Sequence, residues 1–414
     1  MDKRIYLCLA HMGGQEMDYI QQAFDTNWVV SLGPNVDGFE EDLKSYFGQG
    51  RDVVALASGT AAVHLALIAC GVGPGDEVLV QSFTFCAAAN PVLYLGAAPV
   101  FVDSEKDSWN MDPDLLEEAI LDRIRQTGKT PKAIIPVALY GMPYQVDRIL
   151  AIAGRYGIPV IEDAAEGLGS RFDGQLIGSF GRFGVLSFNG NKMITTSGGG
   201  ALVCAQADDR QQILWLATQA RESYPYYQHE AAGYNYRLSN VCAGIGRGQM
   251  AVLEEHLAHH RHVFEQYRRL LAGVPGLHLH ENPSERYRPN FWLTTLTLDP
   301  DLRIRGQENA YRHRENQVVG GVASVLHRAP ALLTNCQPNT NVEALRVFLD
   351  KAGIESRPVC KPMHRQPLYR HAPAYVNGIS ELVFRTGLCL PSGPLVTDED
   401  LRYIVKTIKE AIIS

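Results

Sequence analysis

The chain has 414 residues, of which 46% are hydrophobic and 20% charged, and its formal net charge is −7. This length favours one large domain with a smaller one beside it. The acidic balance argues against a nucleic-acid-binding protein and against a polybasic membrane-surface protein.

The N-terminal segment and the cysteines both bear on the cellular compartment. Residues 1–10 contain only a short apolar stretch, which is too weak for a signal peptide, and no segment approaches the length of a membrane span. The eight cysteines are scattered singly, without zinc-ligand or redox spacing. We therefore expect a cytoplasmic protein with free thiols, no metal site and no membrane or nucleic-acid partner.

Short apolar runs alternate with helical stretches over the first part of the chain. The runs cover residues 53–57, 77–81, 100–102, 133–137 and 158–161. One helix is predicted from Ser58 to Cys70, and a second, rich in small residues, from Ala87 to Tyr94. Apolar strands that alternate with helices are typical of a mainly parallel sheet that is buried on both faces. The sequence therefore predicts an α/β fold.

The second half of the chain has a different pattern. Residues 239–271 form one long helical pattern, with Met250, Leu253 and Leu257 on one face, which we interpret as a connector between domains. Few strands follow, and residues 398–413 form an amphipathic helix. We predict a large domain over 1–250 and a small α+β domain over 251–414, with a long insertion near 300–340 of unassigned role.

Three small residues follow the first predicted strand. Ser58, Gly59 and Thr60, with Ala61 behind them, open the helix at this point. The free backbone amides and the positive dipole of a helix N-terminus make a natural phosphate site. The same residues also make an ordinary helix cap, so this signal alone is weak.

Asp163 ends the predicted strand before the next helix. Ligands of open α/β sheets collect at the carboxyl ends of the strands, so a carboxylate here is well placed to meet one. Pyridoxal 5′-phosphate requires an anion against its pyridine nitrogen, because a protonated ring is the better electron sink. The alternative interpretation is a simple N-cap of the following helix.

Lys192 lies in a segment that has no other charged residue. Residues 186–200 contain no acid and no second base, and apolar strands are predicted on both sides. A lysine acts as a nucleophile when its surroundings expose the free amine. The alternative interpretation is an exposed lysine on a hairpin.

The order of these three signals is more specific than any one of them. The aspartate follows the phosphate-site helix by about 100 residues and the lysine follows the aspartate by about 30, which is the order found in fold-type I pyridoxal-phosphate enzymes. Residues 244–248 look like a dinucleotide-binding loop, but no strand precedes them, so we discount that motif.

The chain resembles the nucleotide-sugar aminotransferases of the aspartate aminotransferase superfamily over nearly its whole length. The segments that carry the resemblance are 83–87, 162–166, 187–200, 233–237 and 357–364. It implies the type I fold, with a mainly parallel seven-stranded sheet between helices, and pyridoxal 5′-phosphate as cofactor. Relatives that dehydrate sugars have histidine in place of Lys192, so the lysine favours transamination.

The resemblance also implies roles for individual residues. Lys192 would form the Schiff base and shuttle the proton, and Asp163 would face the pyridine nitrogen. Asn235 would reach the phosphate of a neighbouring subunit, which makes a homodimer with shared active sites. The other implied cofactor contacts are Phe85 stacked on the ring, Ser187 and the amides of Gly59, Thr60 and Ala61 at the phosphate, and Glu166 near the phenolic oxygen, where the family often has Gln.

The substrate class follows from the last matching segment. Arg357, Lys361 and His364 resemble the version in enzymes that aminate carbon 4 of UDP-linked N-acetyl-4-keto-6-deoxy-hexoses, with L-glutamate as amino donor. These basic residues would suit an anionic nucleotide diphosphate, although each is also typical of a solvated turn. The open alternatives are amination at carbon 3, a GDP-linked sugar, and a pyridoxal-phosphate-binding regulatory protein without turnover.

Overall fold

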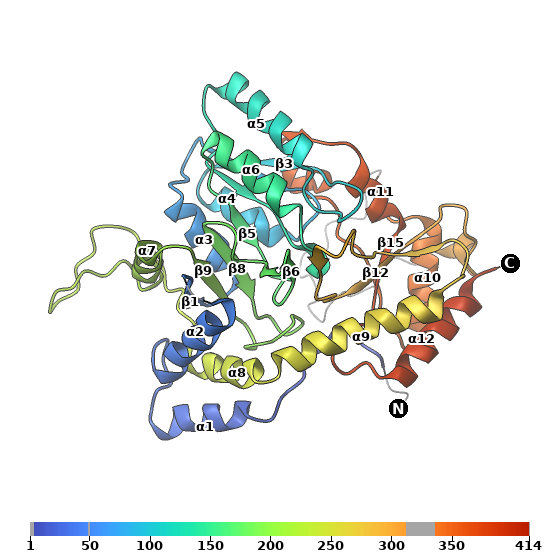
Figure 1. Ribbon diagram of the computed structural model, residues 1–414, viewed down its shortest axis with the longest axis horizontal. Helices are drawn as coiled ribbons and strands as arrows, with labels where there is room; N and C mark the ends of the chain where they lie inside the picture. Colours follow the sequence, from blue (N-terminus) through green and yellow to red (C-terminus); the bar gives the residue numbers. More distant parts are fainter. Residues whose placement is uncertain (1–3, 49, 312–335, 414) are drawn as a thin grey trace.

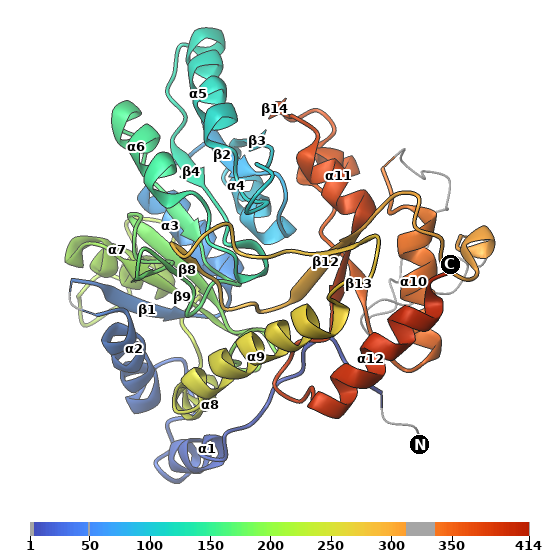
Figure 2. The same ribbon diagram turned by 45° about the vertical axis from the view of Figure 1, so that its right-hand side comes forward.

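The computed structural model describes residues 4–48, 50–311 and 336–413. Figures 1 and 2 show a large body around a central sheet, and a smaller part beyond the long helix α9 (Leu253–Leu271). The chain passes from one part to the other along this helix. Among the described residues, none of the helices combines the length and the apolar character that crossing a membrane requires.

Within the described residues, the central sheet has seven main strands. Two parallel bridges, Ile134 to Val160 and Val137 to Asp163, join its two halves. In spatial order the strands are β1 (Asp52–Leu56), β9 (Gly200–Cys204), β8 (Phe183–Ser187), β5 (Ile161–Asp163), β4 (Ala133–Ile135), β2 (Glu77–Gln81) and β3 (Ala98–Val102), with the two-residue β14 (Ala374–Tyr375) at the outer edge. All neighbouring strands run parallel except β9, which is antiparallel to both β1 and β8. The predicted fold class is confirmed.

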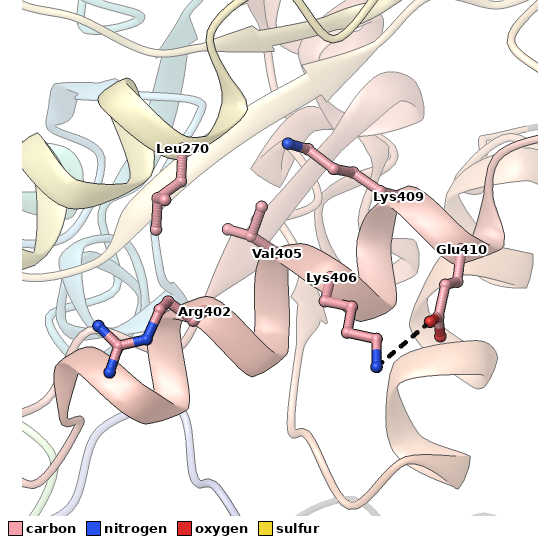
Figure 3. Close-up of a pocket in the computed structure, with 6 residues that line it drawn as sticks. All are labelled: Leu270, Arg402, Val405, Lys406, Lys409 and Glu410. Atoms are coloured by element: carbon pink, nitrogen blue, oxygen red, sulfur yellow. Dashed lines mark ion pairs between the residues drawn. The ribbon is translucent and has the colours of Figure 1, made fainter.

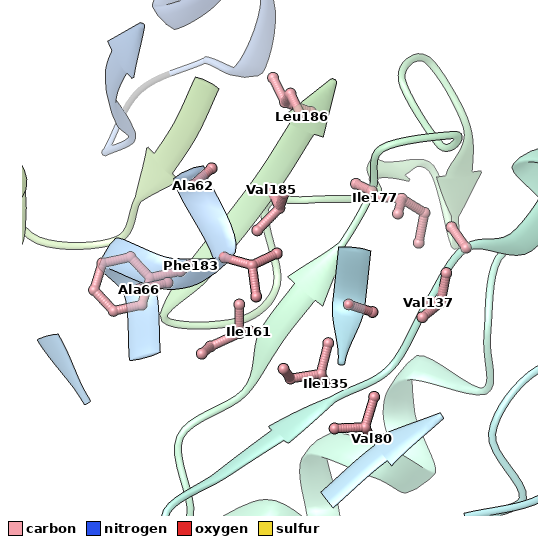
Figure 4. Packing of buried hydrophobic residues seen from close by; sticks show 14 of the residues in the cluster. Ala62, Ala66, Val80, Ile135, Val137, Ile161, Ile177, Phe183, Val185 and Leu186 are labelled. Carbon is pink, nitrogen blue, oxygen red and sulfur yellow. The ribbon is translucent and has the colours of Figure 1, made fainter. Parts of the chain in front are cut away.

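The apolar runs of the sequence become the buried strands of this sheet. Figure 4 shows Val80, Ile135, Ile161, Phe183 and Val185 of neighbouring strands packed together beside helix α3 (Gly59–Ala69). These side chains are almost completely buried, as expected for strands that are covered on both faces.

Helices cover the sheet and gather at its β1 end. Helix α3 lies across β5, β8 and β9 with α7 beside it, whereas α1, α2 and α8 pack together near β1 (Figure 1). The helices of this part are α1 (Glu16–Asp25), α2 (Pro34–Phe47), α3, α4 (Asn90–Tyr94), α5 (Pro113–Thr127), α6 (Val146–Tyr156), α7 (Ala207–Ala217) and α8 (Asn240–Met250).

Two predicted helices are interrupted. The helix expected over 87–94 is a short 3₁₀ turn, Cys86–Ala88, followed by α4, because Pro91 fits only the first turn of a helix. The helix expected over 239–271 breaks at Ala251 and Val252, where Val252 leaves the helical region with φ −111° and ψ 5°. The break lets α8 pack on α1 and α2 while α9 continues into the smaller part.

The C-terminal part is a second sheet with helices, as predicted for an α+β unit. Its antiparallel strands, in spatial order, are β10 (Leu277–Leu279), β12 (Thr294–Leu298), β15 (Gly387–Leu390) and β13 (Arg357–Pro358). Its helices are α9, α10 (Thr340–Lys351), α11 (Ile379–Thr386) and α12 (Asp398–Ala411). A small third sheet, β11 (Tyr287–Arg288), β6 (Arg171–Phe172) and β7 (Gln175–Leu176), joins both parts.

The buried apolar side chains form two clusters that correspond to these parts. The smaller cluster contains side chains of α9, α10, α12 and β12, and also Ile5 near the N-terminus. Val359 and Cys389 belong to the larger cluster. The chain therefore crosses between the two cores more than once, and the boundary at residue 250 stays a prediction. Of the predicted insertion near 300–340, residues 312–335 lie outside the described residues.

Candidate active site

A cavity of about 400 Å³ opens at the carboxyl ends of β5 and β8 and beside the start of α3. Eight of the predicted site residues line it: Gly59, Thr60, Phe85, Asp163, Glu166, Ser187, Lys192 and Arg357. The structure therefore brings together the three separate signals of the sequence, the helix N-terminus, the aspartate and the lysine.

Asp163 is the last residue of β5 and is only 7% exposed. One of its carboxylate oxygens accepts a hydrogen bond from the backbone amide of Ala165 at 3.1 Å. Burial raises the pKa of Asp163 to about 6, while the nearby charge of Lys192 acts in the opposite direction. A buried carboxylate of this kind is stabilised by a cation in the cavity.

The start of α3 forms the second element of the site. The Ser58 hydroxyl accepts the amide of Ala61 at 3.0 Å and caps the helix, so this amide is already used. The amides of Gly59 and Thr60 lie in the first turn, where no helical carbonyl precedes them. Such amides and the helix dipole suit a phosphate group.

Strand β9 comes unusually close to this helix start. Gly200 pairs with both Leu56 and Ser187, which places Ser187 next to Gly59. A Cβ atom on Gly200 would lie 2.4 Å from the backbone nitrogen of Gly59, so only glycine permits this approach. The side chain of Ser187 and the backbone of Gly59 and Thr60 therefore line the same part of the cavity, an arrangement that would suit an anion.

Lys192 lies in the loop between β8 and β9 and is largely buried, with a side-chain exposure of 14%. Its Nζ atom is 3.2 Å from Oε1 of Glu166 and 4.3 Å from the centre of the Trp292 ring. The alternative of an exposed hairpin lysine is therefore wrong. The only charged neighbour that contacts this amine among the described residues is Glu166.

Three residues of the site were not found by sequence reasoning. Trp292, Tyr140 and Asn290 all lie at or directly behind the cavity wall. Trp292 and Asn290 precede β12 and are about 100 residues from Lys192, in a stretch without a regular hydrophobic period. Tyr140 has a left-handed backbone with φ 55°, a conformation that is rare for a bulky residue and marks strain at a site. No sequence signal pointed to these three.

The remaining predicted residues lie outside the cavity lining. His364 is held by Ser82 Oγ at 2.7 Å and by Glu381 at 3.2 Å, and Lys361 follows the cavity residue Cys360 without lining the cavity itself. Asn235 pairs with Thr218 at the end of α7. Their predicted contacts with substrate or cofactor stay predictions.

A second hollow lies between α9 and α12 on the smaller part (Figure 3). It is lined by Leu270, Arg402, Val405, Lys406, Lys409 and Glu410, none of which belongs to the predicted site. Lys406 and Glu410 form an ion pair one helical turn apart, which is typical of an exposed helix face.

The main cavity matches the requirements of pyridoxal 5′-phosphate group by group. The amide pocket suits the phosphate, and the buried Asp163 carboxylate suits a protonated ring nitrogen. Lys192 supplies a primary amine in the same cavity, and the exposed face of Phe85 is free to stack on a flat ring.

Comparison with known proteins agrees with this arrangement. Residues 10–312 and 301–409 match the model of the DegT/DnrJ/EryC1/StrS aminotransferase family. The chain is 42% identical to the putative pyridoxal phosphate-dependent aminotransferase EpsN of Bacillus subtilis, over 99% of this chain and 96% of that protein. It is 33% identical to GDP-perosamine synthase of Caulobacter vibrioides, over 99% of both chains. A DegT DnrJ EryC1 StrS aminotransferase from Brucella abortus has the same fold, with a TM-score of 0.81, 29% identity and coverage of 96% and 95%.

Proposed function

The chain belongs to the DegT/DnrJ/EryC1/StrS family of pyridoxal-phosphate-dependent sugar aminotransferases, and we propose that it moves the amino group of L-glutamate to carbon 4 of a UDP-linked 4-keto-6-deoxy-N-acetylhexosamine. The product would enter the biosynthesis of a surface polysaccharide or glycan. The observation that carries the catalytic part of this proposal is Lys192, a largely buried amine in one cavity with Asp163 and the amide pocket of α3.

Different residues of the cavity would bind different groups of the cofactor. Pyridoxal 5′-phosphate, when bound, supplies an aldehyde that condenses with amines and a ring that withdraws electrons. The amides of Gly59 and Thr60 and the Ser187 hydroxyl would take its phosphate, and Asp163 would keep a proton on its ring nitrogen. Phe85 would cover one face of the ring. Each of these groups lines the cavity.

Lys192 would perform the proton transfers. Its Nζ atom would accept the proton from the α-carbon of glutamate in one half-reaction, and would deliver a proton to carbon 4 of the sugar in the reverse direction in the other. A single amine can do both because glutamate and the sugar enter the same cavity one after the other. Ping-pong kinetics should result.

Arg357 is the predicted basic residue best placed to meet the nucleotide diphosphate. It lines the cavity, and its Nη2 atom is 2.7 Å from Oε1 of Glu355. This ion pair orients the guanidinium, while about half of the side chain stays exposed. A guanidinium can bind a diphosphate in a bidentate manner. Lys361 and His364, which follow Arg357 in the chain, would then contact the anionic part of the substrate, as the sequence predicts.

We also propose a homodimer with shared active sites. Asn235 does not line the cavity of its own chain, which fits a role at the phosphate of a partner. Phe85 at the cavity mouth is 63% exposed and Tyr94 is 57% exposed, and apolar side chains of this size suit an interface. We further propose a cytoplasmic location, because seven cysteines, all except Cys336, carry free thiols in the described residues.

The identity of the sugar is tested by following both half-reactions. Glutamate should bleach the absorption of the loaded protein, and a UDP-4-keto-6-deoxy-N-acetylhexosamine should restore it and give a 4-amino product by NMR. Restoration by a 3-keto sugar alone would overturn the assignment to carbon 4. Borohydride should fix the cofactor on peptide 187–200, and a label elsewhere would overturn the role of Lys192.

A GDP-linked keto-sugar is the second candidate, favoured by the full-length similarity to GDP-perosamine synthase. The same spectral assay with GDP-linked and UDP-linked sugars side by side separates the two. If only the GDP sugar restores the absorption, the UDP assignment is wrong.

A further inference from the structure

The amine of Lys192 lies between two partners from distant parts of the chain. Oε1 of Glu166, just beyond β5, is 3.2 Å from Nζ, and the ring centre of Trp292, just before β12, is 4.3 Å from it. Glu166 and Lys192 are both largely buried, with side-chain exposures of 9% and 14%. An ammonium group here has a carboxylate on one side and the negative face of an indole on the other.

One buried side chain aligns both partners. Asn290, which is fully buried, donates from Nδ2 to the backbone oxygen of Glu166 at 2.8 Å, and its Oδ1 accepts the backbone amide of Trp292 at 2.8 Å. A Cβ atom on Gly141 would lie 1.7 Å from this Oδ1, so the backbone of Gly141 lies directly against the amide group. The positions of Glu166 and Trp292 are thus coupled through a single residue.

Each partner has a further restraint of its own. The second oxygen of Glu166 accepts the backbone amide of Tyr140 at 2.7 Å. The indole nitrogen of Trp292 donates to the backbone oxygen of Asn191, the residue before Lys192, at 2.6 Å. The carboxylate and the ring are therefore fixed in place before the amine meets them.

We propose that Glu166 and Trp292 form a seat that holds the Lys192 ammonium during the part of each catalytic cycle in which the lysine is not joined to the cofactor. This inference rests on the proposed function, because transamination releases the lysine in one of its half-reactions. A free lysine side chain has many rotamers, and fixing one of them costs entropy that contacts must offset. The seat keeps the amine within the cavity. Glu166 and Trp292 are in this sense positioning residues.

A carboxylate performs a task here that an amide cannot. A Gln in place of Glu166 would have no charge to pair with an ammonium. Glu166→Gln keeps the size and an oxygen that accepts the amide of Tyr140, and replaces the charged oxygen that faces Lys192 by a neutral NH2 group. Trp292→Phe keeps a smaller aromatic face, whereas Trp292→Leu removes it.

The test measures the reactivity of Lys192 rather than turnover. The full-length protein is loaded with pyridoxamine 5′-phosphate, which has no aldehyde for the lysine to attack, and is then treated with a limiting amount of acetic anhydride. Mass spectrometry gives the acetylation of Lys192 relative to Lys409, a lysine on α12 in the same sample. An ammonium held by a carboxylate is a poor nucleophile, so a low acetylation ratio indicates that Glu166 and Trp292 hold the amine.

Glu166→Gln should raise this ratio roughly tenfold or more, because a hydrogen bond to a charged group is among the stronger polar contacts. Trp292→Leu should raise it more than Trp292→Phe does. Glu77→Gln is the matched control, since Glu77 forms a partly buried ion pair with Arg123 at 2.6 Å away from the cavity. Its ratio should equal that of the unaltered protein.

An unchanged ratio in both Glu166→Gln and Trp292→Leu would overturn the proposal. If Glu166→Gln fails to fold, the test rests on the two Trp292 variants. Equal acetylation ratios in Trp292→Phe and Trp292→Leu would then overturn the proposal. Borohydride reduction of the pyridoxal-loaded protein separates this result from the proposed function. A label on Lys192 with unchanged acetylation ratios refutes the seat alone, and no label on Lys192 refutes the function itself.

Discussion

The hydroxyl oxygen of Tyr140 accepts a hydrogen bond from the backbone amide of Cys360 at 2.7 Å. The backbone amide of the same tyrosine donates to Glu166, so one residue connects the segment after β13 with the carboxylate beside Lys192. Tyr140 is buried, and burial raises the pKa of its hydroxyl, which keeps the group neutral. The segment that follows β13 in the smaller part is therefore held by hydrogen bonds against the wall of the cavity that carries Glu166.

Tyr140→Phe should destabilise the protein and weaken sugar binding. The change leaves the Cys360 amide without its acceptor, and an unsatisfied buried donor costs about 1–3 kcal/mol of unfolding free energy. Urea denaturation measures the loss, and the KM for the keto-sugar should rise more than the KM for glutamate. Tyr403→Phe is the control, because the Tyr403 hydroxyl contacts Ala352 on the exposed side of α12. Equal effects of the two substitutions would contradict this view of Tyr140.

Asp163→Asn should change how stability depends on pH in the protein freed of cofactor. The pKa of Asp163 is raised from 3.8 to about 6 in the folded protein, so the folded state binds the proton more tightly than the unfolded state does. Between these two values the unaltered protein should lose up to about 3 kcal/mol of stability as the pH rises. Urea denaturation between pH 4 and pH 7 should show this slope, and the Asn variant should lack it.

With pyridoxal 5′-phosphate bound, the stability of the protein should depend much less on the ionisation of Asp163. A cation bound against Asp163 favours the carboxylate, so the cofactor should abolish most of the fall in stability. Asp163→Asn should then bind pyridoxal 5′-phosphate more weakly at pH 7, measured by absorption titration. A stability slope that is identical with and without Asp163 would show that this carboxyl does not titrate as we expect.

Gly200→Ala should damage the phosphate end of the cavity. The added methyl group would overlap the backbone of Ser58 and Gly59, so α3 would have to move away from β9. Such overpacking typically costs about 1–3 kcal/mol, and we expect weaker cofactor binding by absorption titration. Gly190→Ala is the matched control in the adjoining loop, where a methyl group meets open space. If both variants bind the cofactor equally well, the close approach is not required for the phosphate site.

Arg357→Ala should raise the KM for the nucleotide sugar about tenfold or more, because one charged contact with a diphosphate is lost. The glutamate half-reaction, followed by the bleaching of the cofactor, should keep its rate. Arg4→Ala is the control, since Arg4 forms an exposed ion pair with Asp350. An unchanged KM would remove Arg357 from the sugar site.

The sequence predicted those features that depend on local pattern. Fully apolar runs give the buried strands, and the cap at Ser58 gives the start of α3, so the fold class and the position of this helix N-terminus follow from neighbouring residues. Asp163 and Lys192 could be placed because Asp163 ends the strand β5 and Lys192 lies in the loop that follows β8.

The features that were missed depend on contacts across the chain. Trp292 and Asn290 reach the site from the segment between β11 and β12, and a single aromatic or amide residue has no period that reveals its partner. His364 has contacts that its sequence position does not reveal: in the fold it contacts Glu381, which is 17 residues further along the chain, and its role toward a substrate stays a prediction. The break at Val252 depends on how α8 packs against α1 and α2, which the helical period of residues 239–271 does not contain.

The single antiparallel strand of the sheet has a consequence for how this chain can vary. Because β9 runs back between β8 and β1, the lysine-bearing loop leaves and re-enters the sheet at the directly paired residues Ser187 and Gly200. A slip of one residue in this pairing would turn every side chain of β9 to the opposite face and would carry the glycine away from α3. The insertion or deletion of one residue in either flanking strand should therefore abolish cofactor binding while the other sheet remains intact.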